Sequence, residues 1–346
     1  MPEEWPIAAP AADRTVPAQA AGGDRLATVR ADFFLNPAHR LSEQERALMS
    51  AMLHCLVGEV ADAVRAVLPP GWAAANDESN LALVETLSRS GLLDDPALMA
   101  LLVRRADEER IGASARARSG RREARTIQGL VSNEDGAVSA AAMALILARG
   151  RRRDRFGQCL LLFDDLPLEL AEAFVEIICA GLRAGLDPVH GAGAADAELM
   201  AAGRSVLADH DPSRNIDAAT AALIAALNSG QPLEPLILAA AHEGELTFVA
   251  QAAAKRADLG GTTAIDELLS GDVRRVMALL RMAGLAREHA AGILAAIGDL
   301  LGIDDPARAI TLFDRMSDAE VAEARAWLAS PPAYRAAVQA LDSARG

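Results

Sequence analysis

Arginine is the residue type in this chain that is grouped closely enough to bind an anion. The guanidinium group is permanently charged, and its planar donors fit the oxygens of a phosphate or carboxylate two at a time. Residues 104–155 hold 13 arginines against 7 acidic residues, whereas the whole 346-residue chain has a net charge of -14. The candidate anion- or partner-binding residues fall in two groups, Arg116, Arg118, Arg121, Arg122 and Arg125, and then Arg149, Arg151, Arg152, Arg153 and Arg155.

Three interpretations of these arginines stay open. If the helices that carry them stack as repeats, the two groups lie side by side and form one basic strip for phosphates or carboxylates. They can also cover a solvated face, on which Asp107, Glu108, Glu109, Glu123 and Asp154 neutralise several of them, or meet an acidic protein partner. We rank a nucleotide or nucleic acid last, because the chain is acidic overall and only 3% aromatic, which leaves little surface for base stacking.

Histidine and cysteine form no recognisable metal site or catalytic pair. The 6 histidines are dispersed, without the His-Glu-x-x-His or paired-cysteine spacing of a zinc site. His54 precedes Cys55, but consecutive helical residues point about 100° apart and do not face each other. Cys55, Cys159 and Cys179 each lie in an apolar helical stretch, which predicts buried thiols. We therefore expect no cofactor, no metal and no enzymatic activity.

Composition indicates a globular protein. Apolar residues make up 51% of the chain, far from the profile of a disordered one. No run reaches the roughly 18 apolar residues of a membrane span, since even AAMALILA at 141–148 is followed by Arg149. The start, MPEEWP, is acidic where a secretory signal is basic, so we expect a cytoplasmic protein without membrane contact. Lys255 is the only lysine, so the preference for arginine is not by itself a functional signal.

Helical periodicity and helix caps predict an all-α chain. Ser42 with Glu45 forms a capping box for a long helix that ends before Pro69, and Asp95-Pro96 starts another. Ser317 with Glu320 forms a second capping box, and Asp305-Pro306 repeats the Asp-Pro helix start. The predicted helices that follow the one from Pro96 cover residues 105–117, 121–132, 136–149, 152–163, 167–185, 196–209, 216–228, 233–242, 245–257, 262–269, 272–283, 287–301, 306–316, 318–329 and 332–341.

Short connections decide how these helices pack. Turns of about 2–5 residues cannot cross a domain, so neighbouring helices are expected to be antiparallel. No strict repeat consensus is present, and an irregular α-solenoid of helical hairpins is preferred over a compact bundle. Composition divides the chain into a disordered Ala/Pro-rich arm at 1–24, an N-terminal helical domain at 25–187, a Gly/Ala linker at 188–195 and a C-terminal helical domain at 196–346.

Several segments resemble one bacterial family. They are FFLNPAHRLSEQERALMSAMLHCLVGEVADAVRAVL at 33–68, LALVETLSRSGLLDDPALMALLVRRAD, LPLELAEAF, and the stretch 236–301 with MAGLAREHAAGILAAI. Together they resemble the DUF2336 family, which is uncharacterised and mainly alphaproteobacterial. The resemblance covers most of the chain and implies two HEAT-like helical halves, with no catalytic residues to carry over. ARARSGRREART at 115–126 departs from it, being richer in arginine than the family pattern.

We therefore expect a non-enzymatic helical scaffold or regulatory adaptor that mediates protein–protein interaction. The alternative is a binding module for an anionic ligand, a nucleotide or nucleic acid, that uses the Arg-rich strip at 116–155.

Overall fold

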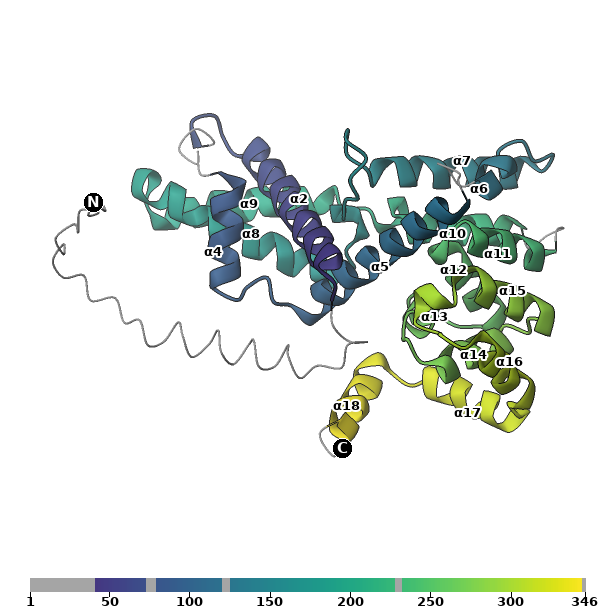
Figure 1. Cartoon of the computed structure of the whole chain (residues 1–346). Coiled ribbons are helices and arrows are strands. Elements are labelled where there is room, and N and C mark those ends of the chain that lie inside the picture. Colours follow the sequence, from purple (N-terminus) through teal and green to yellow (C-terminus); the bar gives the residue numbers. More distant parts are fainter. Residues whose placement is uncertain (1–40, 73–78, 120–124, 228–231, 344–346) are drawn as a thin grey trace, which may run out of the picture. The chain divides into compact units, whose positions relative to one another are not determined.

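A computed structural model of the chain describes residues 41–72, 79–119, 125–227 and 232–343 (Figure 1). Throughout these residues the regular structure is helical and no strand is present, which confirms the all-α prediction. The only extended pairing that they contain is an isolated bridge between Arg153 and Cys159. The predicted arm at 1–24 lies outside the described residues.

The first helix of the described chain carries a long apolar stripe. Helix α2 (Glu43–Val67) buries Met52, Leu56 and Val60 completely or almost so, and it packs against α5, α8 and α9. By length and composition alone α2 is apolar enough to cross a membrane, and it is the one such helix in the described part. Packing against α4, α5, α8 and α9 covers the buried part of this stripe.

Helix α4 (Asn80–Arg89) is followed by α5 (Pro96–Ser119), whose Asp95 cap accepts hydrogen bonds from the amides of Ala97 and Leu98. The predicted break in α5 before residue 105 is wrong, because residues 96–119 form one continuous helix, with no glycine or proline between its first residue, Pro96, and Gly112.

The helix predicted at 152–163 is also wrong. Helices α6 (Arg125–Leu130) and α7 (Gly136–Arg151) are followed by a tight hairpin at 153–159 and a short 3-10 helix, η2 (Phe163–Asp165). The Asp154 side chain accepts hydrogen bonds from the amides of Phe156 and Gln158, and Gly157 takes a positive φ of 81°. An Asp side chain that binds the backbone in this way competes with helix formation.

Residues 188–195, predicted to form a linker, are mostly helical. Helix α8 (Leu168–His190) runs to the turn and α9 (Ala192–Ala208) starts directly after it. Gly191, with a φ of 80°, makes the reversal, and α8 packs against α9. The junction is therefore a one-residue turn between two packed helices, and the division of the chain into two helical domains stays a prediction.

The remaining elements follow the predicted order closely. The two N-terminal signals at Ser317 and Asp305 are confirmed, since their side chains accept hydrogen bonds from the amides of Glu320 and Arg308. The elements are η3 (Pro212–Arg214), α10 (Ile216–Leu227), α11 (Leu233–His242), α12 (Leu246–Ala257), α13 (Gly261–Leu268), α14 (Val273–Met282), α15 (Arg287–Ile297), η4 (Asp299–Leu301), α16 (Pro306–Arg315), α17 (Asp318–Leu328) and α18 (Pro332–Ser343).

Helix α12 lies at the centre of the main apolar core. Its Phe248, Val249 and Ala252 are fully buried, and α12 packs against α5, α10, α11, α13 and α14. The approach of α5 to the turn before α12 is close enough to require glycine. A Cβ at Gly244 would lie 2.7 Å from the Cβ of Ala115 and 2.8 Å from the Cα of Gly112.

Substitution of Gly244 tests this close approach. Gly244 combines a positive φ of 70° with the contact to α5, whereas Gly302 has a similar φ of 78° and open space around it. We expect Gly302→Ala to cost about 1 kcal/mol of stability through backbone strain alone, and Gly244→Ala about 3 kcal/mol. Urea unfolding followed by circular dichroism measures both, and equal losses for the two variants would contradict the close packing of α5 on the α11–α12 turn.

Candidate functional site

The structure distributes the predicted arginines over several elements. Arg116 and Arg118 lie in the last turn of α5, Arg125 begins α6, and Arg149 and Arg151 lie in the last turn of α7. Arg152 follows α7, while Arg153 and Arg155 belong to the hairpin and not to a new helix. Arg121 and Arg122 lie outside the described residues.

Four of these arginines line one pocket of about 580 Å³ that is open to water. Its walls come from α5, the end of α7 with the hairpin, the start of α10 and the turn into α12. The charged residues that line it are Arg105, Arg116, Arg149, Arg152 and Arg153, together with Glu108, Glu109 and Glu245. Arg118, Arg125, Arg151 and Arg155 do not line this pocket.

Carboxylates of the same chain pair with most of the arginines. Glu109 on α5 accepts hydrogen bonds from Arg116 at 3.1 Å and from Arg153 at 2.7 Å, so it joins α5 to the hairpin. Arg149 donates to Glu245, which joins α7 to the α11–α12 turn. Outside the pocket, Arg118 forms a two-bond ion pair with Asp299. The arginines of the described residues are therefore not a bare basic strip.

An ion network around the fully buried Arg105 begins in the wall of the pocket. The Arg105 guanidinium donates to both Glu108 oxygens at 2.8 and 2.9 Å and to Asp217 of α10 at 2.8 Å. Burial lowers the pKa of Arg105, but the charges of Glu108 and Asp217 outweigh it and raise that pKa. The Arg105 guanidinium therefore stays positively charged, and its bond to Asp217 ties α5 to the first turn of α10.

Arg152 pairs less completely than the other arginines that line the pocket. Only 7% of it is exposed. Its Nε lies 3.3 Å from the Asp165 carboxylate and its Nη1 lies 3.7 Å from Glu108. However, Nε and Nη2 have no hydrogen-bond partner among the described residues. Its charge is balanced, but these donors are not satisfied.

The first turn of α12 forms another part of the wall. Glu245 occupies the N-cap position of α12 but makes no side-chain hydrogen bond to the first turn, because its carboxylate is turned to Arg149. Burial raises the pKa of Glu245, and the Arg149 charge opposes that shift. Leu246 and Thr247 of the same turn line the pocket. An uncapped helix N-terminus carries a partial positive charge and favours anions.

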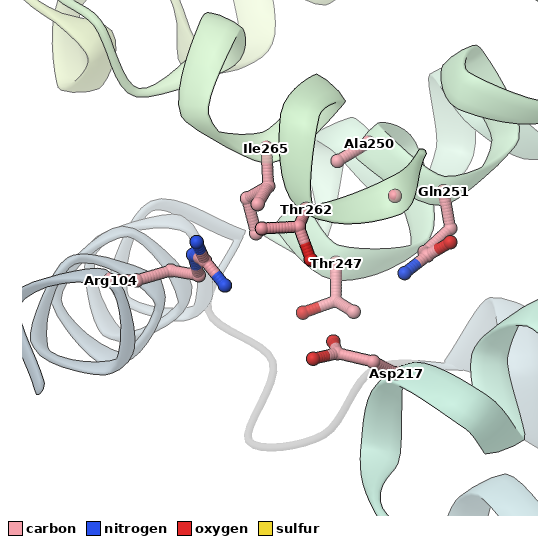
Figure 2. A pocket seen from close by; sticks show the side chains of 8 residues that line it. Arg104, Asp217, Thr247, Ala250, Gln251, Thr262 and Ile265 are labelled. Atoms are coloured by element: carbon pink, nitrogen blue, oxygen red, sulfur yellow. The ribbon is translucent and has the colours of Figure 1, made fainter. Parts of the chain in front are cut away.

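A neighbouring crevice is too narrow to hold a ligand. It lies between α5, α10, α12 and α13 on the other side of Thr247, and it has no space for a water-sized molecule. Figure 2 shows the side chains that converge there, among them Arg104, Asp217, Thr247, Gln251, Thr262 and Ile265. Arg104 donates to Asp266 of α13 at 2.8 Å, so this crevice is a packing seam.

Helix α7 presents a different surface on its outer side. Apolar residues occur on every side of this helix. Val138, Ala142 and Leu145 are buried, and Ile146 lines the pocket. On the remaining side Met143 is 44% exposed and Leu147 is 63% exposed. Beyond the end of α7, Phe156 at the hairpin is 74% exposed, with the Arg155 guanidinium 4.7 Å from its ring centre.

The described ranges show no cluster of metal-ligating side chains. They contain no group of three or more His, Cys, Asp or Glu residues placed to hold a metal ion. All three cysteines are free thiols, and the prediction that each is buried is wrong for Cys55, which is exposed. Burial raises the pKa of Cys179 to about 11, which makes this thiol unreactive.

Comparison with known proteins gives one match. Residues 85–326 match a family described as uncharacterised proteins conserved in bacteria, DUF2336, and this range covers more than half of the chain. The chain belongs to the DUF2336 family. No curated protein and no solved structure matches it.

In this DUF2336 protein, sequence reasoning missed the buried network. One signal for it was present: Arg105 continues the apolar stripe of Leu98, Leu101 and Leu102 in α5, and an arginine in such a position needs a buried partner. Nothing in the local sequence identifies Asp217, 112 residues away, as that partner.

The Arg105–Asp217 pair gives a pH-dependent test. Burial raises the pKa of Asp217, but the charge and hydrogen bond of Arg105 outweigh it and hold this pKa below its usual value of 3.8. The stability that Asp217 contributes is therefore present above the unfolded-state pKa and is lost as the pH falls through the folded-state pKa. We expect Asp217→Asn to lower the urea midpoint at pH 7, and its difference from wild type to shrink below about pH 4.

The midpoints are measured down to the lowest pH at which the wild type still folds. Asp304→Asn is the control, because Asp304 is exposed and its substitution removes the same negative charge at a position away from the network. A difference between Asp217→Asn and wild type that stays constant on acidification would contradict this assignment.

Proposed function

We propose that this DUF2336 protein is a non-enzymatic scaffold or regulatory adaptor that binds another protein along helix α7. The observation that carries the proposal is the exposed apolar side of α7. A helix that is apolar on all sides is normally buried. Here Met143 and Leu147, one helical turn apart, are exposed to solvent.

The hairpin after α7 supports the same surface. Three internal hydrogen bonds to or from Asp154, Arg153 and Gly157 hold it in one conformation. Phe156 is thereby held out of the core although it is the most exposed large apolar residue described in the chain. Aromatic residues held rigidly at a surface are typical anchors in protein interfaces.

The charges beside α7 indicate the chemistry of the partner. Arg155 is exposed and forms no ion pair with the described residues, and Arg151 at the end of α7 is also partly exposed. We therefore propose a partner segment that is apolar along α7 and acidic where it meets the hairpin, in the cytoplasm. Charge of this kind mainly sets the rate and specificity of association.

A HEAT-like arrangement is part of the proposal. Helix α10 packs against α12, α12 against α14 and α14 against α16, and α11, α12, α13 and α14 also pack in sequence. Packing between elements one repeat apart is what an α-solenoid requires. Such a stack would give α7 a rigid support on one side only.

An affinity experiment with the full chain tests the adaptor function. The variant Met143→Gln/Leu147→Gln makes the α7 surface polar while keeping residues that favour helix. A partner is captured from native bacterial lysate, identified by mass spectrometry, purified and titrated against wild type and variant. Loss of two interface anchors should weaken binding at least about tenfold.

The matched control is Leu81→Gln/Met200→Gln, which removes the same two residue types from exposed positions on α4 and α9. It should bind the partner as wild type does. If the α7 variant binds the purified partner with unchanged affinity, the α7 surface is not the interface. If light scattering instead shows a dimer that the α7 variant loses, a second copy of this chain covers the surface.

A further inference from the structure

Arg152 is a buried cation, and two of its donors have no hydrogen-bond partner among the described residues. Its two ion-pair distances, 3.3 Å to Asp165 and 3.7 Å to Glu108, balance its charge without a hydrogen bond at Nε or Nη2. Most buried polar groups in proteins are hydrogen-bonded, and an unsatisfied charged group is costly. A ligand group that accepts these hydrogen bonds would remove the cost.

The pocket next to Arg152 has the size and charge to hold such a ligand. Its volume of about 580 Å³ is typical of a small-molecule site. Five arginines and three glutamates line it, so its wall has two more positive than negative side chains. Asp165 and Asp217 pair with Arg152 and Arg105 but do not line the pocket. An anion inside the pocket would therefore meet the guanidinium groups first.

The N-terminus of α12 adds a second, independent source of positive potential. Helix α12 has 12 residues, and its Glu245 cap makes no side-chain hydrogen bond to the first turn. The Leu246 amide already donates to the Gly244 carbonyl, so Thr247 is the residue of this turn that brings an amide to the pocket that Arg152 lines. Backbone N–H groups and the helix dipole at such an end bind phosphate groups in many proteins. Arg152 and the first turn of α12 thus offer donors from two walls.

We propose that this pocket binds a small molecule that carries a phosphate monoester, whose oxygens accept hydrogen bonds from Arg152 and from the first turn of α12. A tetrahedral phosphate can bridge donors on two walls, and the guanidinium fork matches two of its oxygens. A nucleic acid polymer is the poorer ligand, because the whole chain carries a charge of -14. This inference does not rest on the adaptor function, since the pocket and the exposed side of α7 are different surfaces.

Titration calorimetry with the full chain tests the site. The probes are inorganic phosphate and glycerol 3-phosphate, at an ionic strength kept constant with sodium chloride. We expect one phosphate monoester to bind per chain and Arg152→Lys, which keeps the charge but loses the fork, to weaken binding at least about tenfold. Arg118→Lys is the control, because Arg118 pairs with Asp299 outside the pocket, and it should bind as wild type does.

If Arg152→Lys does not fold, a second pair of variants tests whether phosphate binds in this pocket. Gln128 is exposed and lines the pocket, so Gln128→Glu adds a negative charge to the wall without changing shape. It should weaken phosphate binding severalfold, whereas Gln158→Glu, the same change on the exposed hairpin outside the pocket, should not.

Three results would overturn the proposal. The first is that neither probe binds at about ten millimolar, a concentration well above the millimolar dissociation constants of weak sites. The second is that all four variants bind phosphate equally well. The third is that duplex DNA binds and glycerol 3-phosphate does not. Loss of phosphate binding in Gln128→Glu with partner binding intact would separate this site from the adaptor surface.

Discussion

The buried charge of Arg105 constrains the arrangement around the pocket more than any other single group. A guanidinium removed from water is costly unless nearby carboxylates accept its hydrogen bonds, and here Glu108 and Asp217 do so from α5 itself and from α10. Sliding α5 along α10 by one turn would separate Arg105 from Asp217 and leave the buried guanidinium with Glu108 of its own helix alone. Since α10 packs against α7 and α12, the same pair fixes the frame in which these helices meet.

Shape and charge cooperate at this junction. The α11–α12 turn approaches α5 closely because Gly244 and Gly112 have no side chains, and this contact brings Glu245 within reach of Arg149. Partly exposed ion pairs such as Arg153 with Glu109 contribute little net stability. Their effect is positional: they hold the hairpin and the end of α7 around the pocket, while the apolar core under α12 supplies most of the stability.

Local sequence signals predicted the helices well and the contacts between them poorly. The helix caps at Asp95, Asp305 and Ser317 depend only on residues close by in the sequence, so the sequence predicts these helix starts. The failure at 152–163 has a local cause too, because Asp154 and Gly157 stabilise a turn that apolar periodicity does not reveal. Arg105 could be suspected from its place in an apolar stripe, but its partner Asp217 and the wall contributed by α12 depend on long-range packing that no local pattern encodes.

The arginines show why residue type alone does not identify a site. Arginine replaces lysine almost everywhere in this chain, so a run of arginines reflects composition as much as function. Arg116, Arg118, Arg149 and Arg153 each bind a carboxylate, which is how a folded acidic protein ordinarily uses such residues. Arg152 differs in one physical respect: it is buried beside an open pocket, and two of its nitrogens donate to nothing in the described chain. Burial without hydrogen bonds is costly for a charged group, so a fold that keeps this arginine in place is better explained by a ligand in the pocket than by a solvated surface.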